Sequence, residues 1–131
     1  MSFIADLVQK LTESGGEVAP ATTPTFTGDG KDNLDVSVAD SSTDYLVNFA
    51  LDVSLIQAII IVSDKDVTME TNDGTTPADT INLLANNPYI WYTGSYFTNL
   101  LTTDITGLYF TNSSGGVANV KLLVIKDTTP A

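Results

Sequence analysis

Short apolar runs separated by polar, turn-forming segments fill the chain between residues 55 and 127. The runs are rich in Ile, Val, Thr and Tyr, and the separating segments read SDKD, NDGTTPAD, NNP and NSSGG. β-Branched and aromatic residues favour strands, while Gly, Pro, Asn, Asp and Ser favour the turns between strands. The pattern therefore predicts a series of short strands in this part of the chain.

The alternation has a period of two from residue 34 onward. The segments 34–38 (LDVSV) and 45–51 (YLVNFAL) each place an apolar residue at every second position. Such alternation puts one face of a strand on a core and the other in solvent or against a partner. We expect residues 40–44 to form the hairpin turn between these two strands. The same reasoning along the chain predicts about eight strands, at 33–39, 44–52, 55–63, 66–71, 79–85, 89–93, 104–111 and 117–126.

Strands of this length and spacing are typical of an antiparallel β-sandwich. The predicted fold class is all-β, a sandwich of about eight strands with jelly-roll or related Greek-key topology. A chain of 131 residues has room for one hydrophobic core. We assign residues 31–131 to the β-sandwich domain and treat residues 1–30 as a separate N-terminal segment.

The N-terminal segment has a different pattern. Apolar residues recur at helical spacing within residues 1–13, followed by Gly15 and Gly16, which predicts a short helix. The next residues, EVAPATTPTFTGDGKDN, are typical of an extended arm. Because so short a helix is marginal alone, we expect its apolar stripe to dock on its own domain or on a neighbouring subunit. The candidate contact residues of this stripe are Phe3, Ile4, Leu7, Val8 and Leu11.

The charge of the chain narrows the range of partners. The chain has sixteen acidic residues, five lysines and no arginine, which gives a formal net charge of −11. Nucleic-acid binding requires clustered cations, and anionic lipid repels an acidic surface, so we expect neither nucleic acid nor membrane as a partner. The first residues lack the basic region of a signal peptide.

Residues that carry catalysis or bind metals are scarce. The absence of His and Cys excludes the commonest general base, thiolate metal sites and Cys nucleophiles. Asp64 and Asp66 flank Lys65 in a tight turn, which favours a charged turn over an acid–base pair. We therefore expect a non-enzymatic protein without catalytic residues.

One cluster of oxygen ligands invites comparison with calcium sites. Asp29, Asp32, Asn33 and Asp35 lie close together, but Lys31 stands where an EF-hand needs another oxygen. We interpret the cluster as a solvated loop and expect no metal or cofactor.

Aromatic residues concentrate in the stretch from residue 89 to residue 97. Alternation places Tyr89 and Trp91 on one face of the predicted strand, and Ile90 and Tyr92 on the other. One set belongs to the core, and the other is available for an assembly contact or for stacking on a sugar. Candidate contact residues here are Trp91, Tyr92 and Tyr96.

Several longer motifs fall between residues 56 and 127. They read IxAIIIVSDxDVTxxTN, ADTINLxANxPYIW and TTDITGLYFTNSSGGxAxVKLLVIKD. Within them, Asn87–Pro88 precedes Trp91, and the strand Leu108–Asn112 precedes the small-residue turn Ser113–Gly116. In these features the chain resembles a family of small virion-associated proteins of tailed bacteriophages.

The resemblance implies a non-enzymatic structural component of a phage virion. The expected role is that of a capsid cement, or decoration, protein that lies on the capsid exterior and binds across subunits of the major capsid protein. It would be made in the host cytoplasm and would form a homo-oligomer, for which we favour a trimer. Two alternatives stay open: a tail or head-fibre subunit, and a carbohydrate-binding β-sandwich module that uses Trp91.

Overall fold

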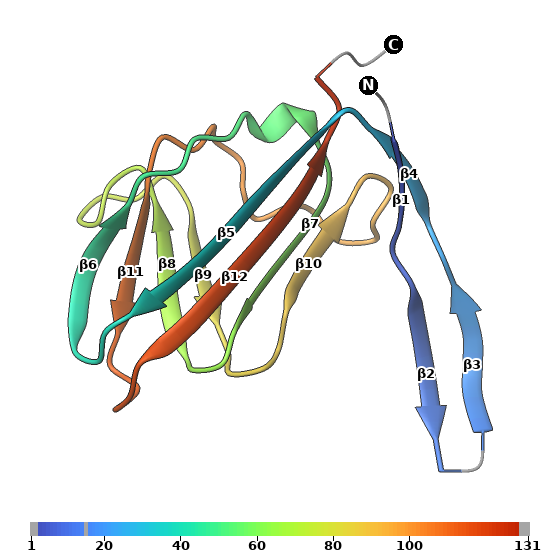
Figure 1. The fold of residues 1–131 in the computed structure, drawn as a ribbon, viewed down its shortest axis with the longest axis horizontal. Coiled ribbons are helices and arrows are strands. Elements are labelled where there is room, and N and C mark those ends of the chain that lie inside the picture. The colour runs from blue at the N-terminus through green and yellow to red at the C-terminus, as the bar shows by residue number, and fades with distance from the viewer. Residues whose placement is uncertain (1–2, 15, 129–131) are drawn as a thin grey trace.

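The chain is built almost wholly from β-strands (Figure 1). The computed structural model describes residues 3–14 and 16–128, and for residues 3, 10–13 and 17–21 it describes the backbone alone. Two four-stranded sheets form a sandwich, and two two-stranded ribbons precede it in the chain. No helix in the described part of the chain is long and apolar enough to span a bilayer.

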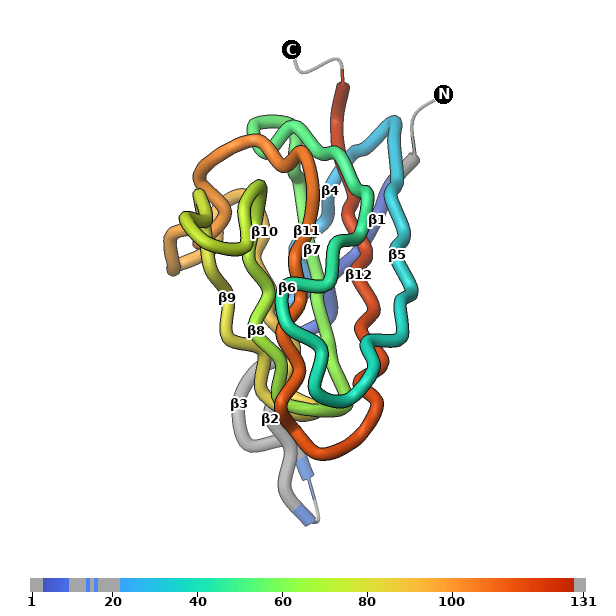
Figure 2. Tube along the Cα trace, turned by 90° about the vertical axis from the view of Figure 1, so that its left-hand side faces the viewer, coloured from blue at the N-terminus to red at the C-terminus, as the bar shows by residue number. Residues whose placement is uncertain are grey.

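The two sheets lie face to face (Figure 2). The first sheet has the order β10-β7-β12-β5, from strands β5 (Gly30–Val38), β7 (Ile56–Ser63), β10 (Tyr89–Tyr92) and β12 (Ala118–Lys126). The second sheet has the order β6-β11-β8-β9, from strands β6 (Ser42–Val47), β8 (Val67–Thr71), β9 (Thr80–Leu83) and β11 (Leu108–Asn112). A short 3-10 turn, η1 (Val53–Leu55), precedes β7.

The order of the strands is that of a jelly roll. The outermost strands of the series pair with each other, and so do the next ones inward: β5 with β12, β6 with β11, β7 with β10 and β8 with β9. This is one long antiparallel hairpin wound around a common core, and the pairs β12–β7 and β11–β8 join its turns into two sheets. The predicted all-β antiparallel sandwich is confirmed, and each of the eight predicted strands overlaps an observed one.

The core lies between the inner faces of the two sheets. Strands β8 and β11 alternate strictly between buried and half-buried residues, as a strand with one face on a core should. Phe110 and Met69 from one sheet, and Ile61 from the other, have no solvent exposure. The apolar positions with a period of two are therefore the residues that hold the sheets together.

The segment at residues 40–44 does not form the predicted hairpin turn. β5 and β6 lie in different sheets, so this turn carries the chain across the sandwich. Ser41 and Asp44 adopt positive φ angles of 65° and 51°. The prediction was wrong because alternation identifies the apolar face of a strand but not the strand with which it pairs. Here β5 pairs with β12, which lies far away in the sequence.

The predicted N-terminal helix is also wrong. Residues 3–6 and 9–13 form strands β1 (Phe3–Asp6) and β2 (Gln9–Glu13). β1 pairs with β4 (Thr25–Gly28), and β2 pairs with β3 (Gly16–Thr22). A helix this short is marginal in water, whereas pairing with the extended arm satisfies the backbone of both segments. The arm is extended, as expected, and the domain boundary at residue 30 stays a prediction.

The two ribbons follow each other along one side of the molecule (Figure 1). The β1–β4 ribbon packs beside the first sheet, where β4 runs against β7 and β12. The β2–β3 ribbon continues beyond it and extends away from the sandwich (Figure 1). A hydrogen bond from the Tyr92 hydroxyl to Gln9 Oε1, 3.3 Å long, joins the start of β2 to β10.

Candidate functional site

The two sheets expose different kinds of residue on their outer faces. An antiparallel sheet with one face in water normally carries polar residues on that face. The β6-β11-β8-β9 sheet follows this rule, although Leu46 on β6 is 49% exposed. Its polar outward residues include Thr68, Glu70, Thr80, Asn82 and Thr111.

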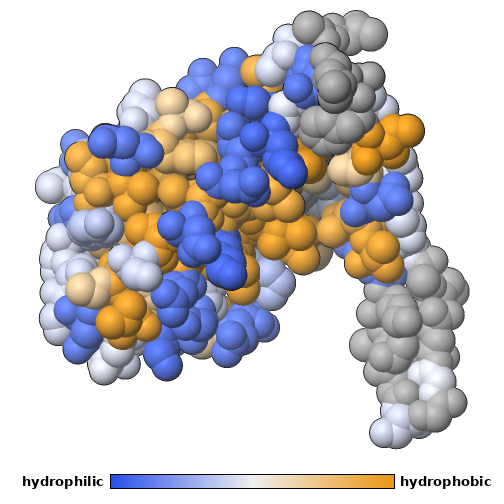
Figure 3. All heavy atoms as spheres, viewed as in Figure 1, coloured by the Kyte–Doolittle hydropathy of each residue, from blue (hydrophilic) through white to orange (hydrophobic). Residues whose placement is uncertain are grey.

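The β10-β7-β12-β5 sheet departs from this rule, because apolar side chains run across its outer face. In the register of the sheet, Ile60 is the cross-strand partner of both Ile90 and Leu123, and Ala58 is the partner of both Tyr92 and Ile125. Figure 3 shows hydrophobic residues gathered on this side of the molecule. We call this surface the outer apolar face; it consists of Ala58, Ile60, Val62, Ile90, Tyr92, Leu123 and Ile125.

The sequence analysis missed most of this face, although a signal was present. Strand β7 contains the uninterrupted run Ile59–Val62, and β12 contains Leu122–Ile125. Continuous apolar runs are typical of strands that are covered on both faces, whereas β8 and β11 alternate. These runs therefore place apolar side chains on both faces of β7 and β12.

The N-terminal ribbon covers one end of the outer apolar face. Phe26 on β4 is only 6% exposed, and its ring lies 5.6 Å from the ring of Tyr92, at an angle of 55°. A small apolar cavity of about 110 Å³ remains beneath the ribbon. Its lining includes Leu7 and Phe26 from the ribbon and Ala58, Ile60, Leu123 and Ile125 from the sheet. Phe26 anchors the ribbon, although its place in the predicted extended arm gave no sign of this role.

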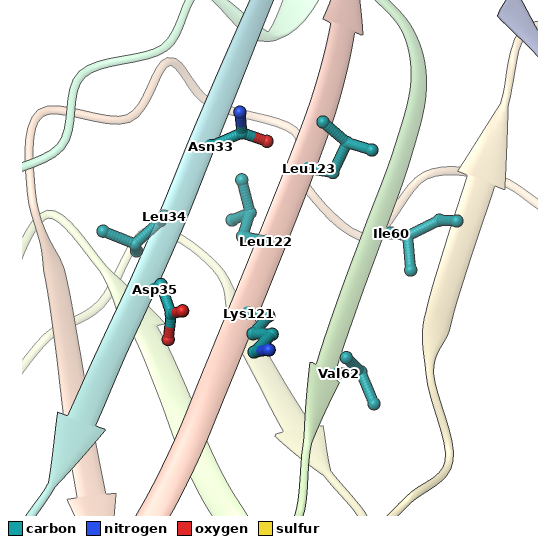
Figure 4. A pocket seen from close by; sticks show the side chains of 8 residues that line it. All are labelled: Asn33, Leu34, Asp35, Ile60, Val62, Lys121, Leu122 and Leu123. Carbon is teal, nitrogen blue, oxygen red and sulfur yellow. The ribbon is translucent and has the colours of Figure 1, made fainter.

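The other end of the outer apolar face is uncovered. A shallow hollow of about 350 Å³ lies at this end, and its lining includes Ile60, Val62, Leu123, Asp35 and Lys121. Figure 4 shows how these side chains lie on β5, β12 and β7. Leu123 is 38% exposed there. The uncovered part thus continues directly from the part that the ribbon covers.

A second exposed apolar feature is the loop at residues 95–100, which we call the aromatic loop. Tyr96 is 94% exposed and Phe97 is 75% exposed, and their rings make an edge contact at 5.2 Å. The loop is nevertheless held in place by side chains of β10. Trp91 Nε1 donates to the carbonyl oxygen of Phe97 at 3.0 Å.

Tyr89 supports the same loop. Its hydroxyl donates to Asn99 Oδ1 at 2.6 Å and accepts from the Leu100 N–H at 2.9 Å. Burial raises the pKa of the Tyr89 hydroxyl, so it stays protonated and can donate. The aromatic loop is therefore a preorganised apolar tip, and exposed aromatics of this kind are typical of protein contacts.

The structure places the predicted contact residues in different surroundings. Trp91 is half-buried and packs against the core with Tyr89, so the predicted alternation along β10 is confirmed. Tyr92 lies under Phe26, and Tyr96 is exposed on the aromatic loop.

The contact residues predicted for the N-terminal segment lie on the ribbon instead of a helix. Ile4 is 72% exposed and Val8 is 67% exposed, while Leu7 is half-buried and faces the sheet. The side chains of Phe3 and Leu11 lie outside the described residues.

The oxygen cluster near residue 30 does not converge on one point. Asp32 pairs with Lys126 Nζ at 3.0 Å, and Asp29 accepts from the Thr128 N–H at 2.7 Å. Asn33 and Asp35 lie on the opposite face of β5 from Asp32, because successive residues of a strand alternate. Within residues 3–14 and 16–128, no group of three acidic side chains is arranged to hold a metal ion.

Asp64 and Asp66 act as acceptors for separate backbone groups. Asp64 accepts from the N–H and the side-chain amide of Asn119, at 2.8 Å and 2.9 Å, and these bonds lower its pKa. Asp66 accepts from the Ala85 N–H at 2.7 Å. A general acid needs a raised pKa, so this arrangement favours turn stabilisation over proton transfer.

Comparison with known proteins adds little to this picture. No protein-family model matches the chain, and no curated protein matches it. Among solved structures, a chain from Bacillus endospore appendages, described as a novel family of disulfide-linked pili, is similar with 10% identity and a TM-score of 0.41. The match covers 76% of this chain and 88% of that chain. A likeness this distant carries no inference about function, and the present chain has no Cys.

Proposed function

We propose that this protein is a non-enzymatic structural component of a tailed-phage virion, a cement protein that binds the capsid exterior through its aromatic loop. The proposal depends on one observation: Tyr96 and Phe97 are highly exposed, yet the backbone of their loop is held in place by a hydrogen bond from Trp91. The resemblance of residues 56–127 to small virion proteins supplies the phage context. The jelly roll is compatible with this role, since viral capsid proteins use it, but so do lectins and enzymes.

The aromatic loop has the properties of a binding hot spot. Burying one large apolar side chain completely contributes about 1.5–3 kcal/mol. Because Trp91 and Tyr89 already hold the loop, binding would cost less ordering entropy than it would for a free loop. Repeated contacts from an oligomer on a regular shell would add avidity.

The charge of the chain suits such a role. A net charge of −11 keeps unassembled copies apart and soluble. The aromatic loop itself, residues 95–100, contains no charged residue, so the contact does not require desolvation of a charge.

Cosedimentation with purified phage heads tests the proposal. We expect the Tyr96→Ser, Phe97→Ser double variant to bind at least about 30-fold more weakly than the unaltered protein, which corresponds to about 2 kcal/mol. Tyr45→Ser is the matched control, since Tyr45 is 46% exposed on β6 and lies outside the loop. Equal binding of the double variant and the control would contradict attachment through the loop.

Labelled antibody and electron microscopy of intact particles separate the cement role from its alternatives. Label distributed over the whole head supports a cement protein. Label confined to the tail or to fibres would assign the protein there instead. Absence of label from every part of the particle would overturn the virion role altogether.

A further inference from the structure

We propose that the uncovered part of the outer apolar face is occupied by the β2–β3 ribbon of a second copy of this chain. The contact makes a homo-oligomer by exchange of ribbons. It uses a surface different from the aromatic loop, so it does not depend on the virion role.

The first argument is continuity with an interface that already exists within the chain. The outer apolar face binds a ribbon at one end, where Phe26 and Leu7 pack over Ile125 and Ala58. The same row of apolar residues continues through Ile60 and Leu123, which line both the cavity under the ribbon and the open hollow, to Val62, which lines the hollow but not that cavity. A surface that is complementary to a two-stranded ribbon at one end is suited to bind another one beside it.

The second argument concerns the β2–β3 ribbon itself. An isolated two-stranded hairpin is marginally stable at best in water, because it has no sheet face or core to pack on. This ribbon leaves its own sandwich after Gln9 (Figure 1). The backbone of the ribbon therefore has no sheet beside it within its own chain, while one end of the outer apolar face has no ribbon over it.

The third argument comes from the contrast between the two sheets. The outer face of the β6-β11-β8-β9 sheet is mainly polar and needs no cover. The outer apolar face is the less polar surface, and its neighbours Asp35 and Lys121 offer one charge of each sign beside the hollow. A neutral balance at the rim suits a contact between identical, strongly acidic chains better than a uniformly negative rim would.

The geometry also favours a closed oligomer. The β2–β3 ribbon of each copy extends away from its own sandwich (Figure 1), so it is available to the face of a neighbour. When two copies exchange reciprocally, the same contact forms twice around a two-fold axis, and a ring of three satisfies each ribbon and each face as well.

The mass of the free protein in solution gives the first test. We expect light scattering at micromolar concentration to report a dimer or a larger closed oligomer. The Val62→Asp variant should shift to the monomer, with a dissociation constant raised at least about 100-fold, because a charge would be buried in the contact. Val62 lines the open hollow and not the cavity under the chain's own ribbon. Leu46→Asp is the matched control, since Leu46 is an exposed leucine on the opposite sheet, and it should leave the mass unchanged. Circular dichroism establishes that both variants are folded.

Disulfide cross-linking gives the second test. Because the sequence contains no Cys, only the introduced cysteines can form cross-links. Ser14→Cys marks the ribbon near its tip, and Lys121→Cys marks the hollow on a separate, differently tagged preparation. After mixing, we expect cross-links between these two chains, and few between Ser14→Cys and Thr80→Cys on the opposite sheet. A monomeric protein, an oligomer that survives Val62→Asp, or equal cross-linking to both sheets would each overturn the proposal. Because neither measurement uses phage particles, this proposal and the virion role can fail separately.

Discussion

Asn112 is a fully buried polar residue whose side chain forms hydrogen bonds with two turns of the chain. Its side-chain amide donates to the carbonyl oxygens of Val38, Ala39 and Gly116, at 3.0, 3.3 and 2.8 Å. Its Oδ1 accepts from the N–H and the hydroxyl of Ser114, at 3.0 and 2.7 Å. One side chain at the end of β11 thus holds both the β5–β6 turn and the β11–β12 turn, and we predict that Asn112→Ala is strongly destabilising.

The magnitude follows from the number of bonds. The amide has two hydrogens, so its three acceptors share the equivalent of about two hydrogen bonds, and Oδ1 accepts about two more. At a net value of about 1 kcal/mol each, the variant loses about 4 kcal/mol of unfolding free energy. That is a large fraction of the roughly 5–15 kcal/mol typical of a domain, and it lowers the melting temperature by about 10–20 °C.

Urea denaturation of three variants measures the effect. Asn112→Ala should lower the midpoint with an unchanged slope. Asn112→Asp keeps the acceptor but loses the donors and faces three carbonyl oxygens with a negative charge. It should therefore be at least as destabilising at pH 7 and recover partly in acid. Asn82→Ala is the exposed control, with an expected effect within about 0.5 kcal/mol.

The results that refute this reasoning are specific. If Asn112→Ala lies within about 1 kcal/mol of the unaltered protein, the turns are held by other contacts. If Asn112→Asp is clearly more stable than Asn112→Ala at pH 7, the donor bonds to the carbonyl oxygens do not dominate.

Two further predictions concern the ribbon and the pH dependence. Phe26→Ala should leave the sandwich folded but raise amide hydrogen exchange in β1 and β4, because Phe26 anchors the ribbon; exchange that stays slow would contradict this role. Bonds from the backbone N–H groups of Thr75 and Thr76 lower the pKa of Asp73, so its ionised form stabilises the fold above the unfolded-state pKa, near pH 4. The stability lost in Asp73→Asn should therefore be largest at neutral pH and shrink as the pH falls through the folded-state pKa, which denaturation series at pH 7 and pH 3 would measure.

The local pattern of the sequence was sufficient for the strands and for the inner faces. Each predicted strand between residues 33 and 126 overlaps an observed one, because alternation with a period of two reports directly which side of a strand is buried. The alternation along β10 also placed Tyr89 and Trp91 together on one face, and the structure shows that this face is the core side. These properties depend on neighbouring residues, so they are readable without knowledge of the fold.

The candidate surfaces were only partly readable. Tyr96 was identified as a contact residue from the aromatic residues near it in the sequence. The hydrogen bond from the Trp91 side chain to the Phe97 carbonyl oxygen, which holds the loop, could not be predicted from the spacing of residues. The outer apolar face was missed because the run Ile59–Val62 was used only to predict a strand, without a prediction of what lies against its second face. Part of this face is exposed because the ribbon covers only one end of it.

Strand pairing and the N-terminal ribbons were decided by the tertiary structure. The residues of 40–44 suit a hairpin turn, yet β5 pairs with β12, because closing the roll joins the two ends of the strand series. The spacing of apolar residues in 3–11 fits a helix, but the partners that decide its structure, β4 and the outer apolar face, lie elsewhere in the sequence. The sequence by itself determined which residues avoid water, since that depends on each side chain. Only the fold decided what covers them, because that depends on which distant segments meet.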